Sequence, residues 1–188
     1  YGIDHIAASF MRRGSDIDLV KEATEEKMKI ISKIECRYGL LNIDEIIEKS
    51  DYILIDRCDL SKEISIEKIP LTQKLIIEKS RRHGKGVFVA TNLLETMVEK
   101  IKPTRAEVND IVNTILDGAD GLTLSAETAT GKYPMECINT INKIIQHSEL
   151  EFKMDEYICN DKRKISPYLV KNNYFSSINK CDLLIKPN

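Results

Sequence analysis

The amino-acid sequence predicts an α/β fold: a parallel (β/α) barrel of the TIM type, incomplete over these 188 residues, with about five βα units. Short β-branched apolar runs alternate with segments of helical period, which is typical of a parallel sheet covered by helices. Polar residues follow every one of the apolar runs. No Gly-x-Gly-x-x-Gly motif or phosphate-binding P-loop follows any of them, so a dinucleotide-binding sheet is not indicated.

The first half of the chain contains three expected strands, at 3–10, 28–35 and 52–56. We expect a helix that opens near Ser15 after the first strand, and a second helix with Asn42 as its N-cap after the next. A loop then leads to Pro70, which suits the first turn of a helix. That helix is expected to end at Gly84, because glycine commonly terminates helices.

The second half adds two strands, at 86–91 and 121–125. Between them Thr104 opens a capping box for a helix that stops at Gly118. Pro134 opens the last periodic helix, which we expect to run to about Ser148. Because the pattern fails after about residue 150, we divide the chain into a barrel segment, residues 1–149, and an irregular tail or linker, residues 150–188.

Composition excludes several classes of function. A net charge of −2 and interleaved basic and acidic residues give no basis for nucleic-acid binding. No apolar run approaches the about 18 residues of a membrane span, so no membrane partner is expected. Five cysteines without metal-ligand spacing fit a reducing, cytoplasmic location. The chain opens on Tyr1 rather than Met, so we expect a piece of something longer or a chain without its true start. As partners we expect a second copy, in a homo-oligomer, or the rest of a larger polypeptide.

Polar side chains gather where the strands end, and this favours a barrel over an open doubly wound sheet. Both folds place their sites at the carboxyl ends of parallel strands, but a barrel draws its site from many strands at once. Here all five strands contribute, through Ser9, Lys33, Glu35, residues 56–59, Thr91, Ser125 and Glu127. Five strands cannot close a barrel of eight, so we expect another segment or chain to cover the edges.

Lys33, Glu35 and Asp59 are the charged residues with a clear chemical interpretation. Side chains along a strand alternate faces, so Lys33 and Glu35 point the same way. Asp59 follows the next strand, and two carboxylates from neighbouring strand ends are a common Mg²⁺ site. The sequence therefore predicts a metal and phosphoryl site, although a simple Lys–Glu salt bridge and an aspartate that caps a turn are the structural alternatives.

Six stretches of the chain, in this order, carry a family resemblance: DHIAASFMR, IISKIE, RCDLSKEIS, VFVATNLLETM, KPTRAEVNDIVNTILDGADG and LTLSAETATGKYP. From Asp4 to about Ser148 the chain resembles the pyruvate kinase family, over the second part of that family's catalytic barrel. The resemblance implies a glycolytic transferase that moves the phosphoryl group of phosphoenolpyruvate to ADP, giving pyruvate and ATP. It also implies Mg²⁺ or Mn²⁺, and K⁺, whose ligands in the family lie in strands outside this chain.

The resemblance also implies roles for individual residues. Lys33 matches a lysine that contacts the transferring phosphoryl group, and Glu35 and Asp59 match the metal ligands. Backbone amides around Cys58 and Asp59 match those that bind the substrate carboxylate, and Thr91 matches a threonine beside the substrate. Two further residues match groups near the face where the enolate is protonated, Ser125 and Glu127.

Several positions depart from the family pattern. The family loop Ala-Arg-Gly-Asp-Leu-Gly is replaced here by residues 56–61, Asp-Arg-Cys-Asp-Leu-Ser, and Ala126 stands where the family has glycine. A Cβ at such positions changes the backbone cradle around a substrate. Two other functions therefore stay open: a degenerate module that senses a ligand or acts as a scaffold within a larger protein, and an aldolase- or lyase-type barrel that uses the same Mg²⁺ site.

Overall fold

The computed structural model describes the fold of residues 2–158 and the side chains of residues 2–149. Its centre is one five-stranded sheet in which every neighbouring pair is parallel and the strand order follows the chain. The strands are β1 His5–Ala8, β2 Lys29–Ile34, β3 Tyr52–Asp56, β4 Gly86–Ala90 and β5 Gly121–Thr123. The α-helices of the described part are α1 Gly14–Ala23, α2 Arg37–Leu41, α3 Ile43–Lys49, α4 Arg57–Glu63, α5 Ile69–Arg82, α6 Arg105–Leu116, α7 Ala126–Ala129 and α8 Pro134–Ile158.

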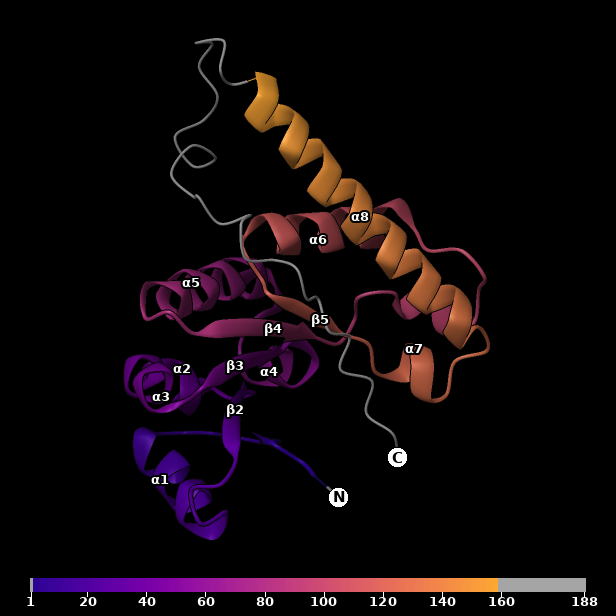
Figure 1. The fold of residues 1–188 in the computed structure, drawn as a ribbon. Helices are drawn as coiled ribbons and strands as arrows, with labels where there is room; N and C mark the ends of the chain where they lie inside the picture. The colour runs from indigo at the N-terminus through magenta and orange to yellow at the C-terminus, as the bar shows by residue number, and fades with distance from the viewer. Residues whose placement is uncertain (1, 159–188) are drawn as a thin grey trace.

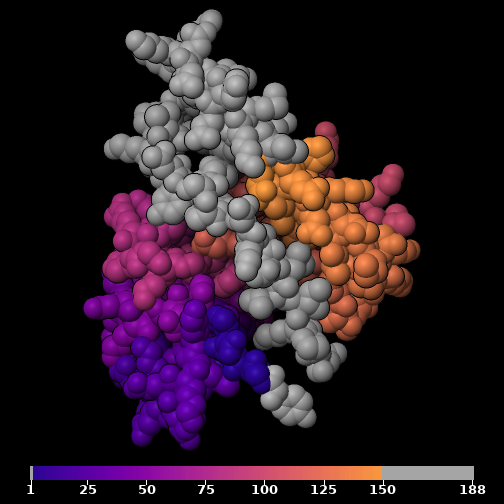
Figure 2. Space-filling model, in the orientation of Figure 1, coloured from indigo at the N-terminus to yellow at the C-terminus, as the bar shows by residue number. Residues whose placement is uncertain are grey.

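The βα units lie side by side in the order of the sequence (Figure 1). The colour of the space-filling view accordingly changes step by step from indigo to orange across the molecule (Figure 2). Two 3₁₀ turns, η1 Ile66–Lys68 and η2 Glu95–Val98, lie in the connections, and α8 packs across α6. A doubly wound sheet reverses its strand order at a switch point, and this sheet does not.

Apolar side chains on the two faces of the sheet have different partners, which confirms the barrel prediction. On one face, Ile34, Ile55 and Val89 belong to a large buried core shared with the helices. On the other face, the apolar partners of buried Ile31, Leu54 and Ala90 among the described residues are other strand residues. A sheet covered by helices on one face and lined by its own strands on the other is part of a (β/α) barrel, with the second face as the interior.

The interior face changes from aromatic to charged along the strands. Near the amino ends, the rings of His5, Tyr52 and Phe88 form a ladder with centroids 5.7 and 5.8 Å apart. Alternation then places Lys33 and Asp56 on the same face at the carboxyl ends. The charged Lys33 and Asp56 therefore lie at the carboxyl-end mouth of the barrel.

Most of the expected elements are confirmed to within a few residues. Pro70 lies in the first turn of α5, and Gly84 follows that helix with a φ of 66°. Thr104 and Glu107 form both hydrogen bonds of the capping box at the start of α6. Asn42 occupies the N-cap position of α3 but donates its side-chain amide to the carbonyl of Arg12 instead of capping.

The structure differs from the sequence prediction in three connections. Residues 57–63, expected as loop, form α4, because the Asp56 side chain accepts from the Asp59 amide and caps the helix. Two short helices, α2 and α7, were not predicted, since a single turn carries no measurable periodicity. The last helix continues past Ser148 to Ile158, into the segment expected to be irregular. The rest of that expected tail, residues 159–188, lies outside the described residues, and the boundary at 149 stays a prediction.

Within residues 2–158 no helix is both long and apolar enough to cross a membrane.

Candidate active site

Lys33 and Glu35 form an ion pair at the carboxyl end of β2, as expected for side chains on one face of a strand. Glu35 is 1% exposed, and its second oxygen accepts a 2.6 Å hydrogen bond from the Phe10 amide. Lys33 also lies 3.5 Å from the Ser9 hydroxyl. These contacts therefore connect the turn after β1 to the end of β2. Phe10, in that turn, has a positive φ of 55°.

Asp56 ends β3 and binds three groups at once. One of its oxygens lies 3.3 Å from the Lys33 ammonium. The other accepts from the Thr91 hydroxyl at 3.2 Å and from the Asp59 amide at 3.4 Å. Asp56 is 7% exposed, so these contacts replace most of its hydration.

Three carboxylates come together at this mouth, those of Glu35, Asp56 and Asp59. One oxygen of each lies within 4.8 Å of the others. Asp59 is the most exposed of the three and pairs with Lys62 at 2.7 Å on the solvent side. Carboxylate oxygens at this spacing are hard donors that suit Mg²⁺ or Mn²⁺, so the donor set fits the cation that the sequence implies.

The neighbouring carboxylates of Glu35 and Asp56 keep the Lys33 ammonium in its charged form. Burial lowers its pKa, but the hydrogen bonds and negative charges of Glu35 and Asp56 outweigh burial, so the net effect is a raised pKa. A lysine in this state carries a full positive charge at neutral pH. It can therefore attract a phosphoryl or carboxylate group but cannot act there as a base.

Thr91 lies just beyond β4 in a left-handed turn, with φ of 70°, followed by Asn92 with φ of 52°. Its hydroxyl lies 2.6 Å from the Ala90 carbonyl and 3.2 Å from Asp56, either of which can accept its proton, and it accepts a 2.9 Å hydrogen bond from the Cys58 amide. Arg57 holds the turn from behind by donating to the carbonyl oxygens of both turn residues, at 2.8 and 2.9 Å. Thr91 therefore joins the site, in a geometry that depends on its neighbours.

Ser125 and Glu127 form a separate arrangement. Glu127 is 2% exposed, and its oxygens accept from the Leu94 amide at 3.1 Å and from the Ser125 amide at 2.9 Å. It is not one of the three clustered carboxylates. In this state Glu127 ties the start of α7 to the connection after β4, and its proposed part in proton delivery stays a prediction.

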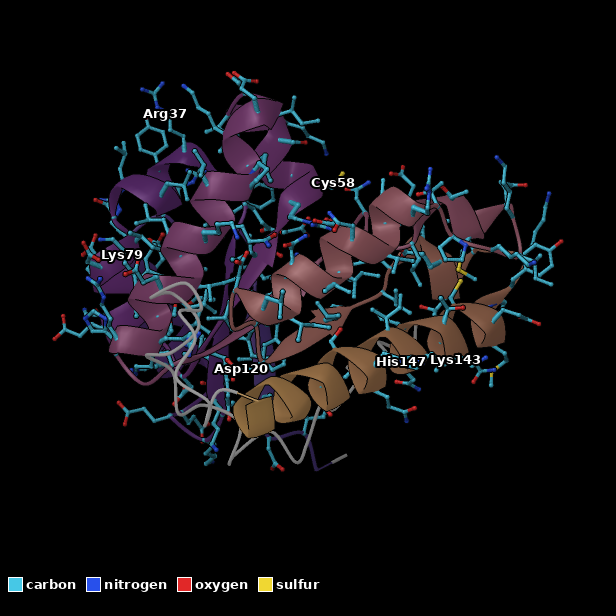
Figure 3. The ribbon with its side chains drawn as sticks, turned by 90° about the horizontal axis from the view of Figure 1, so that it is seen from above. Arg37, Cys58, Lys79, Asp120, Lys143 and His147 are labelled. Carbon is cyan, nitrogen blue, oxygen red and sulfur yellow. The ribbon has the colours of Figure 1, made fainter. Side chains whose placement is uncertain are left out.

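Cys58 lies in the first turn of α4 with an exposed thiol (Figure 3). Figure 3 also shows Asp120, which immediately precedes β5, toward the other end of the sheet. The contact that Cys58 makes to the site runs through its backbone amide, which donates to Thr91. Its side chain is not required for that contact.

Sequence reasoning overlooked two contributions. Asp56 appears in the sequence only as one of the polar residues at the end of the third strand, and its place at the centre of the cluster follows from strand alternation once the end of β3 is known. Arg57 belongs to the same group of polar residues and has no role in the sequence prediction, although it is 9% exposed and reaches Asp110 on α6 at 2.6 Å. The signal available in the sequence is an arginine that follows an apolar strand directly, at the end of the strand where the site residues gather.

Comparison with known proteins gives one consistent result. Residues 1–138 match a family model described as pyruvate kinase, barrel domain. The pyruvate kinase of Clostridium acetobutylicum is 43% identical over 164 residues, which cover 85% of this chain and 35% of that protein. That of Geobacillus stearothermophilus is 46% identical, covering 79% of this chain and 26% of its own length, and that of Thermotoga maritima is 44% identical, covering 86% and 36%. The chain therefore spans about a third of the length of the curated relatives it matches.

Proposed function

The chain belongs to the pyruvate kinase family, and from this premise we propose that it supplies the metal and phosphoryl side of a pyruvate kinase active site. The proposed reaction transfers the phosphoryl group of phosphoenolpyruvate to ADP, producing pyruvate and ATP. The observation that carries the proposal is the meeting of Lys33 with Glu35, Asp56 and Asp59 at one barrel mouth. Phosphoryl transfer needs positioning and charge neutralisation more than a covalent nucleophile, and these residues offer both.

Each residue has a role that its surroundings support. Lys33, kept charged, would bind the transferring phosphoryl group and oppose the negative charge that develops on the enol oxygen. Thr91 offers a hydroxyl donor at the same mouth, and the amides of Cys58 and Asp59 lie beside it. A substrate carboxylate that takes these donors would be oriented relative to Lys33.

Glu35 and Asp59 would hold Mg²⁺ or Mn²⁺, with Asp56 within the same 4.8 Å group of oxygens. When bound, such a cation neutralises and orients the anionic substrate. Glu35 already has one oxygen fixed by the Phe10 amide, so its orientation is set before any ligand arrives. K⁺ and the nucleotide are proposed from family membership alone.

The decisive experiment measures pyruvate formation by the natural full-length protein with Mg²⁺ and K⁺. We expect Lys33→Met to reduce kcat about a hundredfold or more, the usual effect of losing one electrostatic contact to the transition state. Lys79→Met is the matched control, because Lys79 pairs with Asp44 on the helical layer. The control should keep its activity within about twofold, as for other exposed ion pairs.

Two results would count against the proposal. Turnover that is unaffected by Lys33→Met would remove the lysine from the reaction. If phosphoenolpyruvate binds by calorimetry in the presence of Mg²⁺ but no pyruvate forms, the degenerate ligand-sensing module becomes the correct interpretation. Exchange of the methyl protons of pyruvate without ATP formation would instead favour a lyase-type reaction.

A further inference from the structure

The Asp56 carboxylate accepts contacts from three donors that belong to three different segments. They are the Lys33 ammonium from β2 at 3.3 Å, the Thr91 hydroxyl after β4 at 3.2 Å, and the Asp59 amide of α4 at 3.4 Å. An ammonium, a hydroxyl and an amide that point at one place are what a small external carboxylate or phosphate requires. In this structure an internal carboxylate takes that place.

We propose that Asp56 is a built-in competitor for the anionic group of the substrate, so that an incoming anion must displace its carboxylate before it can use these donors. The inference rests on the proposed function, because it takes the substrate to be an anion that binds at this mouth. It identifies Asp56 as a residue that determines affinity and specificity, without any direct part in the transfer step.

The charge of the cluster supports the same conclusion. Glu35, Asp56, Asp59 and Lys33 together carry a formal charge of −2. A bound divalent cation brings these four groups to zero, and Lys62, which pairs with Asp59 on the solvent side, leaves only a weak net attraction for an anion. Alanine in place of Asp56, which is the family residue at this position, would leave the same cluster with a net positive charge when the cation is bound.

Asp56 also has a local structural reason to stay in this position. Its contact with the Asp59 amide caps α4, and its burial requires the compensation that Lys33 and Thr91 provide. Displacement by an anion therefore breaks contacts that the free site has already satisfied. The competition is consequently expected to lower affinity rather than to prevent binding altogether.

The test compares wild type, Asp56→Ala and Asp56→Asn in the natural full-length protein. Oxalate, a small dicarboxylate, is titrated by calorimetry at saturating Mg²⁺, and Mn²⁺ alone is titrated by electron paramagnetic resonance. Asparagine retains an acceptor for the helix cap, so it keeps the test valid if the alanine variant does not fold. Asp44→Asn is the matched control, because Asp44 lies on α3 and pairs only with Lys79 among the contacts described.

We expect both Asp56 variants to bind oxalate about tenfold more tightly than wild type. Mn²⁺ affinity should fall by less than about tenfold, because one negative charge leaves the 4.8 Å group of oxygens, and the Asp44 control should change neither affinity. Oxalate affinity that is unchanged or lower in both variants overturns the inference. If Mn²⁺ affinity also falls more than tenfold, Asp56 is a metal ligand instead. Failure of every form, wild type included, to bind either probe overturns the proposed function and this inference with it.

Discussion

Removing the Arg57 side chain should destabilise the protein far more than its single ion pair suggests. Arg57 is almost fully buried and donates from two guanidinium nitrogens to the Thr91 carbonyl, at 3.2 and 2.8 Å. One of these nitrogens also donates to the Asn92 carbonyl at 2.9 Å. Both turn residues have a positive φ, which costs a β-branched residue such as Thr91 about 1–2 kcal/mol and an asparagine less. Arg57 therefore holds a strained turn that positions a site hydroxyl.

The magnitude follows from those contacts. A hydrogen bond from a charged donor contributes about 1.5–3 kcal/mol, and the Asn92 carbonyl can recover part of its loss from water because that residue is exposed. We expect Arg57→Ala to reduce the free energy of unfolding by about 2–4 kcal/mol. Lysine keeps the charge but offers no planar fork, so Arg57→Lys should lose about 1–2 kcal/mol of the same free energy. The ion pair with Asp110, whose side chain is 42% exposed, accounts for only about 0.2–1 kcal/mol.

Urea unfolding followed by circular dichroism, on the natural full-length protein, provides the measurement. Asp110→Asn is the control, because it removes the ion pair and leaves both carbonyl contacts intact. If Arg57→Ala lost no more unfolding free energy than Asp110→Asn, the carbonyl contacts would contribute nothing to stability, and the predicted role of Arg57 would be refuted. Equal losses in the lysine and alanine variants would refute the argument from fork geometry.

Two further predictions concern stability. Burial alone would raise the pKa of Glu107, but hydrogen bonds from Thr104 and Thr96 hold that pKa below its ordinary value of 4.5. The capping box should therefore stabilise the protein by about 1 kcal/mol above pH 4.5. This stabilisation should be lost as the pH falls further and Glu107 is protonated. Thermal melts of wild type and Glu107→Gln from pH 7 to pH 3 should converge at the acidic end, and a constant difference would contradict this. An added Cβ at Gly121 would lie 2.4 Å from the Phe88 ring, so Gly121→Ala should cost about 1–3 kcal/mol in urea unfolding. Phe88→Leu in the same chain should recover part of that loss, and no recovery would mean that the overlap is not the cause.

The sequence was sufficient to predict what depends on strand period and order. Lys33 and Glu35 are two apart on a strand, so their contact follows from alternation alone. The strand β3 was bounded correctly because its apolar run is uninterrupted and ends at Asp56. Neither step requires knowledge of a contact between distant residues.

What the sequence could not predict depends on contacts between distant segments. The helix α4 buries Leu60 as its one apolar side chain, whereas the equally short α3 buries three isoleucines, so α4 has no apolar stripe in the sequence and forms where Asp56 caps it. The direction of Glu127 depends on the Leu94 amide, 33 positions earlier in the chain. No glycine in the sequence indicates the left-handed turn at Thr91, which is stabilised by the Arg57 side chain. Each of these features decides how the site is built, and each follows from tertiary contacts.

Asp56 shows why matching charged residues are not enough to infer turnover. Lys33, Glu35 and Asp59 are all present, but the family alanine has become a fourth charged group that contacts the lysine and the aspartate amide. The same carboxylate that satisfies the free site opposes an incoming anion, so stability and anion affinity should respond to its removal with opposite signs. Asp56→Ala is expected to lose about 1 kcal/mol of unfolding free energy with the helix cap while it gains affinity for oxalate. If Asp56→Ala lost both unfolding free energy and oxalate affinity, Asp56 would support anion binding by holding the donors in position. Competition between Asp56 and the anion would then be wrong.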